Sequence, residues 1–275
     1  MQAKDALLVS LSDMHSGSNF ALFLPRVWHG RKTSHAPRAA QQLIRERFEI
    51  FADGVATSRK GKSLKLVVNG DAIDGDHHNS GDVCTTDIQE QADIHIELMN
   101  EFQKRIKWQA GDELYYTRGT QTHVNEMENY IGRELNAVMD GDYYVHDLLK
   151  LSVNGVVAWY VHHGPGGGDG ANEGNALRNW LRNIYINALK DGSPIPDIVY
   201  TGHVHNPTYA PLSVRLKDFT FKNIHGIILP SWQLKTAYAW QKAPVSKNRI
   251  GGTMQVIKAD GTIAVPKFSV TASDG

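Results

Sequence analysis

Residues 64–75 read LKLVVNGDAIDG, a short apolar run that ends abruptly in Asn-Gly-Asp. The run has the length and the aliphatic composition of a buried β-strand, and the glycine after it marks a turn. Residues 7–15 repeat the arrangement, because LLVSL leads directly into SDMH. Ligands of open α/β sheets bind beyond the carboxyl ends of the strands. Function is therefore expected in these polar tails.

Outward from these two runs, the chain alternates short β-like segments with helical ones. Strands are expected at 113–117, 148–161 and 197–201, and helices at 38–57, 88–108, 125–139 and 173–190. Asn154-Gly155 splits 148–161 into a hairpin, because this pair favours a type I′ turn. From about residue 206 the chain reads as all-β, with a second hairpin at Asp260-Gly261. The pattern predicts a single α/β domain over residues 1–275, in which helices cover mixed sheets.

Composition excludes several classes of protein. The 29 Lys and Arg residues balance 29 Asp and Glu residues, which argues against a nucleic-acid binder that acts through its overall charge. The single cysteine, Cys84, excludes an intramolecular disulfide and fits a reducing compartment. Neither a signal peptide nor an apolar run of about 18 residues is found, so we expect a cytoplasmic protein with no membrane partner. Thirteen histidines beside one cysteine remain to be explained.

The histidines and aspartates gather in the tails of five expected strands. Residues two apart on an extended backbone share a face, so a D-x-H or an H-x-H pair can converge on one ion. Nitrogen and carboxylate donors without thiolates suit Mn²⁺, Fe, Ni²⁺ or Zn²⁺. The aspartates and histidines of these tails are too many to bind one catalytic ion, and their number fits two ions that share a carboxylate. The tails are Ser12-Asp13-Met14-His15, Gly70-Asp71-Ala72-Ile73-Asp74, Gly119-Thr120-Gln121-Thr122-His123, His162-His163-Gly164 and Gly202-His203-Val204-His205.

These motifs, in this order, resemble the calcineurin-like metallophosphoesterases, whose pattern is D-x-H, G-D-x-x-D, G-N-H-D/E, a histidine after a strand, and G-H-x-H. The resemblance implies a four-layer α/β/β/α sandwich and two divalent ions, with Mn²⁺ as the first choice. It also implies that a hydroxide bridging the two metals attacks the phosphorus of a phosphomonoester or phosphodiester. The implied ligands are Asp13, His15, Asp71 and His205 for one metal, and Asp71, His163, His203 and an amide oxygen of the third block for the other.

The third block departs from the family pattern. The family has Gly-Asn-His, whereas Gly119 is followed here by Thr-Gln-Thr-His. Thr120 can offer a hydroxyl and Gln121 an amide in place of the asparagine oxygen. The resemblance gives His123 the role of assisting the leaving group, and a helical turn would place it on the same face as Thr120. A Gly-Thr-x-x-His block also looks like the phage- and prophage-associated branch of the family.

Further polar residues surround these motifs. Asp74 and His162 are expected to support the ligands by hydrogen bonds instead of binding metal themselves. His77 and His78 follow the Asp74 loop and either line the substrate cleft or belong to a solvated loop. The run GPGGGDG at 164–170 either cradles a phosphate through its backbone amides or forms a flexible loop.

Two alternative functions remain open at this point. The first is a nuclease of the same fold, with nucleic acid as the substrate. The second is a catalytically degenerate protein that binds only metal or a partner. Metal content separates the degenerate protein from an enzyme, and oligonucleotide cleavage separates the nuclease from other esterases. The basic residues that would favour the nuclease are Arg26, Arg31, Lys32, Arg38, Arg45 and the run RKGK at 59–62, which otherwise forms a solvated turn.

Overall fold

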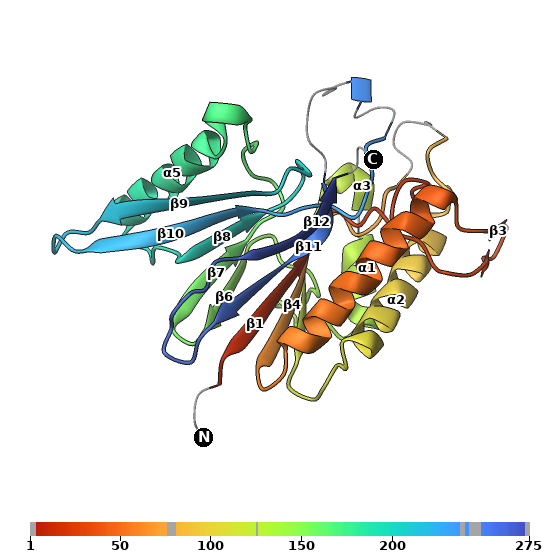
Figure 1. Ribbon diagram of the computed structural model, residues 1–275, viewed down its shortest axis with the longest axis horizontal. Coiled ribbons are helices and arrows are strands. Elements are labelled where there is room, and N and C mark those ends of the chain that lie inside the picture. Colours follow the sequence, from red (N-terminus) through yellow and green to blue (C-terminus); the bar gives the residue numbers. More distant parts are fainter. Residues whose placement is uncertain (1–3, 76–80, 125, 237–239, 242–248, 273–275) are drawn as a thin grey trace.

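The computed structural model describes residues 4–75, 81–124, 126–236, 240–241 and 249–272. Two five-stranded sheets lie face to face, with a helical layer on each outer side (Figure 1). This arrangement confirms the α/β/β/α sandwich. Among the described residues, no helix has both the length and the apolar character needed to cross a membrane. The first helical layer contains α1 (Ala39–Ser58), α2 (Ile88–Arg105) and α4 (Met127–Glu134), and the second contains α5 (Asn175–Asp191).

The first sheet has the strand order β12-β11-β1-β4-β5. Strands β1, β4 and β5 are mutually parallel, so their carboxyl ends reach the same edge. All six residues of β1 are buried, as expected of a strand that is covered on both faces. The bounds are Ala6–Leu11 for β1, Ser63–Asn69 for β4, Glu113–Thr117 for β5, Arg249–Ile257 for β11 and Lys267–Ala272 for β12.

The second sheet has the strand order β6-β7-β8-β10-β9. Asn154 and Gly155 join β6 to β7 with φ angles of 50° and 80°, which confirms the predicted hairpin turn. Strands β7 and β8 are parallel, so their carboxyl ends also share an edge. The bounds are Leu149–Val153 for β6, Val156–Tyr160 for β7, Ile198–Thr201 for β8, Thr208–Arg215 for β9 and Phe221–Ile228 for β10.

Local capping explains where the helices begin and end. Asp87 caps α2 by accepting hydrogen bonds from two backbone amides of its first turn. The helix expected at 125–139 is shorter, because α4 ends at Glu134 and Asn136 has a φ of 53°, a left-handed conformation that stops a helix. A small hairpin, β2 (Trp28–His29) and β3 (Ser34–His35), lies in a stretch that the sequence pattern left irregular.

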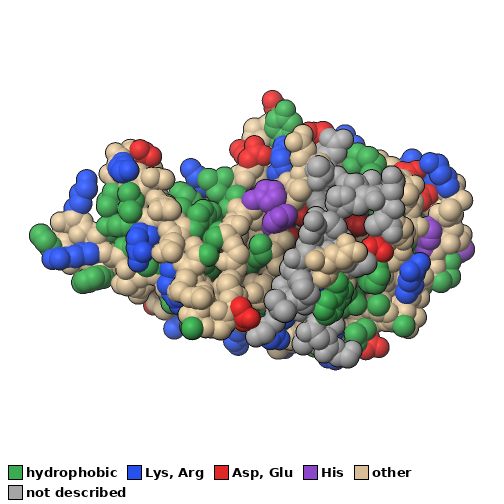
Figure 2. All heavy atoms as spheres, turned by 90° about the horizontal axis from the view of Figure 1, so that it is seen from above, with side chains coloured by type: hydrophobic (Ala, Val, Ile, Leu, Met, Phe, Trp, Pro, Cys, Tyr) green, Lys and Arg blue, Asp and Glu red, His purple; other side chains and the backbone are tan. Residues whose placement is uncertain are grey.

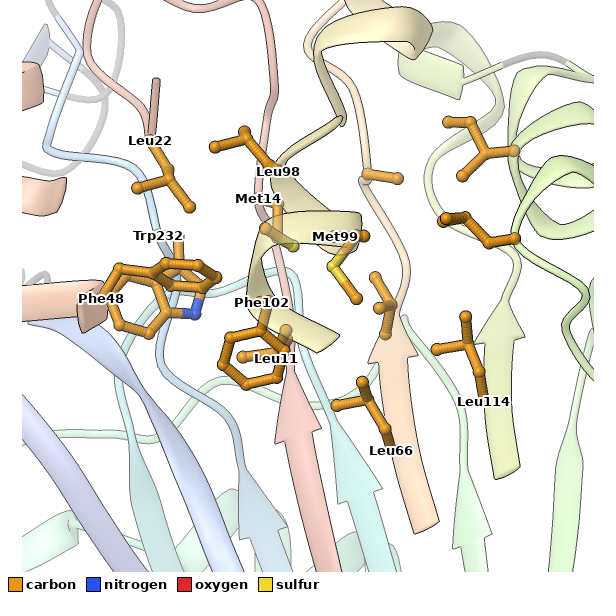
Figure 3. Packing of buried hydrophobic residues seen from close by; sticks show 14 of the residues in the cluster. Leu11, Met14, Leu22, Phe48, Leu66, Leu98, Met99, Phe102, Leu114 and Trp232 are labelled. Atoms are coloured by element: carbon orange, nitrogen blue, oxygen red, sulfur yellow. The ribbon is translucent and has the colours of Figure 1, made fainter. Parts of the chain in front are cut away.

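Aromatic side chains pack within the layers. The Phe48 ring of α1 meets the Trp232 ring edge-on, with 4.9 Å between the two centroids (Figure 3). The Phe102 ring of α2 is tilted against the Phe48 ring, with 5.0 Å between their centroids. On the face between the sheets, Tyr160 of β7 stacks on Tyr200 of β8 at 4.2 Å. Offset and edge-to-face aromatic pairs stabilise a core beyond their buried area. The strands therefore deliver their carboxyl ends from a rigid scaffold.

Candidate metal centre

Five strands end at one place. Strands β1, β4 and β5 of the first sheet and β7 and β8 of the second each release a polar tail there. Within the described residues, three overlapping groups of side chains have ligand atoms within 4.8 Å of one another. Neighbouring groups share Asp13 or His162, so the seven side chains form one continuous cluster. The groups are Asp13–His15–His205, Asp13–Asp71–His162 and His162–His163–His203.

The backbone of this cluster is strained. Nine non-glycine residues of the described chain have a positive φ, and five of these belong to the cluster. Such conformations cost on the order of 1–3 kcal/mol each, although Asp and His tolerate them better than most residues. Backbone strain of this kind is concentrated at functional sites. The backbone conformation therefore indicates a functional site at the same position as the cluster of side chains. The five residues are Asp13, His15, Asp71, His203 and His205, with φ between 44° and 70°.

Asp13 is fully buried and nevertheless ionised. Its carboxylate accepts hydrogen bonds from the Ser12 hydroxyl at 2.5 Å and from the His203 backbone amide at 3.0 Å. The Nε2 atom of His205 lies 3.1 Å from Oδ1 of the same carboxylate. Burial would raise the pKa of Asp13, but attraction by His205 and His162 outweighs it and lowers the pKa to about 2. A charged carboxylate among imidazoles has the chemistry to hold a cation.

His162 and Asp71 face each other where the two sheets meet. The His162 ring is buried, and its Nδ1 donates to the Asn69 carbonyl at 2.8 Å. Its Nε2 lies 3.0 Å from Asp71 Oδ2 and 3.9 Å from Asp13 Oδ1. A neutral ring would aim its Nε2 lone pair at these carboxylates, so the geometry calls for a cation between them, either a proton or a metal. Without metal, burial lowers the pKa of His162, but Asp13 and Asp71 raise it to about 10 overall.

His163 lies on the exposed side of the same cluster. Its ring centroid is 4.9 Å from that of His162 and 4.6 Å from that of His203. Histidine side chains reach the surface together near the middle of the face shown in Figure 2. His162 is buried and His163 is exposed, yet both have a possible ligand atom within 4.8 Å of one on His203. The sequence-based assignment, in which His163 binds metal and His162 supports it, stays a prediction. His77 and His78 lie outside the described residues.

His15 is oriented by a chain of polar side chains. Its Nδ1 lies 2.9 Å from Asp74 Oδ1, which leaves Nε2 facing Asp71 Oδ2 at 3.9 Å. Gln233 donates from Nε2 to Asp74 Oδ1 at 3.0 Å and to the Ser18 hydroxyl at 3.1 Å. Burial lowers the pKa of His15, but the Asp74 carboxylate raises it above its usual value overall. A carboxylate behind an imidazole is the usual support of a metal-binding histidine.

The third block contributes Thr120 to the cluster. Its backbone amide donates to Asp71 Oδ1 at 2.6 Å, and its hydroxyl lies 3.2 Å from Asp71 Oδ2 and 3.4 Å from His203 Nδ1. Gln121 is exposed at the start of α3 (Gln121–Val124). The backbone of His123 belongs to α3, whereas its side chain lies outside the described part of the structure. The hydroxyl of Thr120 thus stands beside both Asp71 and His203.

Two glycines allow the tails to approach one another. A Cβ at Gly119 would overlap the amide nitrogen and Oδ1 of Asp71, and a Cβ at Gly202 would overlap the Ser12 hydroxyl and lie 2.8 Å from Asp13 Oδ2. Ordinary van der Waals contact of a Cβ begins at 3.4 Å. Glycine is therefore required at both positions because no side chain fits between the loops.

Two buried polar residues beneath the cluster were not assigned from the sequence. Glu128 of α4 is fully buried, and burial raises the pKa of its carboxyl to about 7. His95 of α2 lies between the Ser16 hydroxyl at 3.1 Å and the Tyr116 hydroxyl at 2.9 Å. Burial lowers the pKa of His95 to about 3, so its ring is neutral. In the sequence, the signal that could have identified Glu128 and His95 is a polar residue at an inward-facing position of each helix.

No family model matches the chain, and no curated protein matches its sequence. A predicted phosphoesterase from Streptococcus pneumoniae TIGR4 aligns over 98% of this chain and 98% of its own, with 10% identity and a TM-score of 0.33. The NAD nucleotidase of Haemophilus influenzae aligns over 99% of this chain and 51% of its own, with 12% identity and a TM-score of 0.47. A protein of unknown function from Aquifex aeolicus aligns over 73% and 80%, with 15% identity and a TM-score of 0.29.

These similarities are distant, and the sandwich is established by the four layers of this chain itself. None of these comparisons supports the resemblance to the phage-associated branch, which stays a prediction.

Proposed function

We propose that this protein is a metal-dependent phosphoesterase that hydrolyses a phosphomonoester or a phosphodiester. The observation that supports this most strongly is the buried cluster in which Asp13 and Asp71 lie among imidazoles. Carboxylate and imidazole donors suit Mn²⁺, and also Fe, Zn²⁺ or Ni²⁺. Two such ions would supply an activated water and stabilise the charge on the phosphoryl oxygens.

Asp71 is proposed as the shared ligand. Its Oδ2 lies between the Nε2 atoms of His15 and His162, at 3.9 Å and 3.0 Å. The Thr120 hydroxyl takes the place of the family asparagine, and His123 is proposed to donate the proton to the leaving group. The proposed ligands are Asp13, His15, Asp71 and His205 for one ion, and Asp71, His162, His203 and Thr120 for the other.

The proposed role of His162 replaces that of His163 in the sequence-based ligand set. His162 is buried, directs one nitrogen to a backbone carbonyl and the other to two carboxylates. His163 is exposed beside it, and we assign it the role of a substrate contact. His162→Asn should lose about one Mn²⁺ per chain, whereas His163→Asn should keep both ions and lower kcat/KM. Elemental analysis of the two proteins distinguishes these roles, and the opposite result would restore His163 as the ligand.

Hydrolysis of an aryl phosphate and a bis-aryl phosphate in the presence of Mn²⁺ tests the proposed activity. Asp71→Asn should abolish most of the turnover, because this substitution removes the charge that both ions share. Asp142→Asn is the matched control, because Asp142 is exposed in a turn and should leave the rate unchanged. Equal rates in the wild type and Asp71→Asn would exclude this centre as the catalyst. A wild-type protein without bound metal would support the degenerate alternative.

The surface charges favour a small phosphoester over a polynucleotide. Most of the basic side chains that suggested a nuclease are paired with acidic ones, and Arg59 is buried. A cation that is already neutralised by a neighbour contributes little to phosphate binding. Failure to cleave oligonucleotides is therefore expected. The pairs are Arg26 with Glu97 and Glu101, Arg31 with Asp93, Lys32 with Asp87, Arg45 with Glu49 and Glu101, and Arg59 with Asp112.

A further inference from the structure

A buried carboxylate of α4 lies directly beneath the proposed metal centre without belonging to it. Glu128 has no exposed surface and stands in the first turn of α4, where the helix dipole favours negative charge. Its two oxygens accept hydrogen bonds from two different loops. Oε1 accepts from the backbone amide of Ala72 at 3.2 Å, and Oε2 accepts from the backbone amide of Gly119 at 2.7 Å.

Each of these amides adjoins a proposed metal-binding residue. Ala72 follows Asp71 in the tail of β4, and Gly119 precedes Thr120 in the tail of β5. The two tails also touch directly, because the Thr120 amide donates to Asp71 Oδ1 at 2.6 Å. Buried backbone amides require acceptors, and one carboxylate supplies the acceptor for both loops. Glu128 therefore holds the ends of two strands at a set separation.

We propose that Glu128 is a positioning residue that fixes Asp71 relative to Thr120 and thereby sets the metal affinity of the centre. The inference rests on the proposed function in one respect, namely that this centre binds metal. Coordination distances tolerate changes of only about 0.2 Å, so the supports behind the ligands matter. Removing such a support typically weakens metal binding by about 10–100-fold.

Glu128→Gln is the informative substitution. Glutamine keeps the shape of the side chain and one carbonyl oxygen, but its NH₂ group must face one of the two backbone N–H donors. Isothermal titration with Mn²⁺ should show binding about 10–100-fold weaker than in the wild type. Turnover should recover largely when Mn²⁺ is raised to saturation. Glu134→Gln is the matched control, because Glu134 is an exposed residue of the same helix that pairs with Arg133, and its Mn²⁺ affinity should not change.

Amide hydrogen exchange gives a second measurement that needs no metal. The amides of Ala72 and Gly119 should exchange slowly in the wild type and faster in Glu128→Gln. Wild-type Mn²⁺ affinity in Glu128→Gln, or an equal loss in Glu134→Gln, would overturn the proposal. So would rapid exchange of both amides in the wild type, which decides the matter even if Glu128→Gln does not fold. A wild type that binds no Mn²⁺ would overturn the proposed function and the affinity effect, whereas the exchange rates would still show whether Glu128 holds the loops.

Discussion

Gly119→Ala separates the packing of the strand-end loops from general stability. The added Cβ would overlap the amide nitrogen and Oδ1 of Asp71 and lie 3.0 Å from its Cα. Ordinary contact begins at 3.4 Å, so the Asp71 backbone must retreat by roughly 1 Å, far beyond the tolerance of about 0.2 Å for a coordination distance. Overpacking of this kind destabilises a protein by about 1–3 kcal/mol. Loss of Mn²⁺ affinity by at least about 100-fold is expected, at the upper end of the effect of a displaced support.

Gly54→Ala provides the matched control. Gly54 lies inside α1, and the nearest atom to an added Cβ is the Met254 methyl group at 3.6 Å. Alanine is favoured over glycine in a helix by up to about 1 kcal/mol, so this protein should be slightly more stable with unchanged Mn²⁺ affinity. Thermal unfolding without metal measures stability, and isothermal titration measures affinity. Wild-type Mn²⁺ affinity in Gly119→Ala would refute the close approach of Gly119 to Asp71.

Three other predictions concern protonation and packing. The pKa of His162 is raised to about 10 without metal, so its stabilising effect is complete below pH 6.5 and is lost as the pH rises through 10. In the presence of a chelator, the melting temperature should fall as the pH rises through this range. Mn²⁺ binding at pH 7.5 should release a proton, which calorimetric titration in buffers of different ionisation enthalpy measures. Arg59→Ala leaves the Asp112 carboxylate buried and unpaired at the far end of β4, so urea unfolding should show a loss of about 3–5 kcal/mol with unchanged Mn²⁺ affinity. Phe48→Ala should cost about 3–5 kcal/mol in the same assay, because it empties the contact between α1 and the Trp232 ring.

The layered fold follows from short-range patterns in the sequence. Apolar runs such as 64–68 are followed at once by a turn and a polar tail, and parallel strands bring such tails to one edge. The Asn154-Gly155 turn and the apolar face of α1 are equally local signals. The convergence of Asp13, Asp71 and the imidazoles was predictable for this reason, since each motif depends on a few consecutive residues.

The inward orientation of His162 could also be predicted from the sequence, but from strand β6, which pairs with the strand β7 that precedes His162. Strand β7 is apolar on both faces, so its own residues do not reveal which face is inward. Strand β6 alternates clearly, with Leu151 inward and Lys150 outward. The two-residue turn pairs Leu151 with Ala158, which makes the even-numbered positions of β7 inward. Continuing that alternation by four residues places His162 inside and His163 outside.

The supports beneath the centre depend on contacts between distant segments and leave no local pattern. Glu128 reaches Ala72 across 56 residues, and its role exists only because α4 packs under the tails of β4 and β5. Arg59 belongs to a basic run that is typical of a solvated turn, yet its guanidinium is buried against Asp112 and two backbone carbonyls. A pattern in the sequence gives the type of residue, and the tertiary packing decides its partner.

The two sheets contribute different chemistry to the centre. The first sheet supplies the carboxylates of Asp13 and Asp71, whereas the proposed ligands of the second sheet, among them His162 and His203, are imidazoles. Two buried carboxylates on one sheet therefore face imidazoles on the other, and a cation must balance the negative charge. Without metal, the raised pKa of His162 favours a protonated ring as that cation, with Nε2 3.0 Å from Asp71 Oδ2 and 3.9 Å from Asp13 Oδ1 across the sheet interface. A metal ion at the proposed centre would bind residues of both sheets, so its binding would be coupled to the packing of the sheets at this edge.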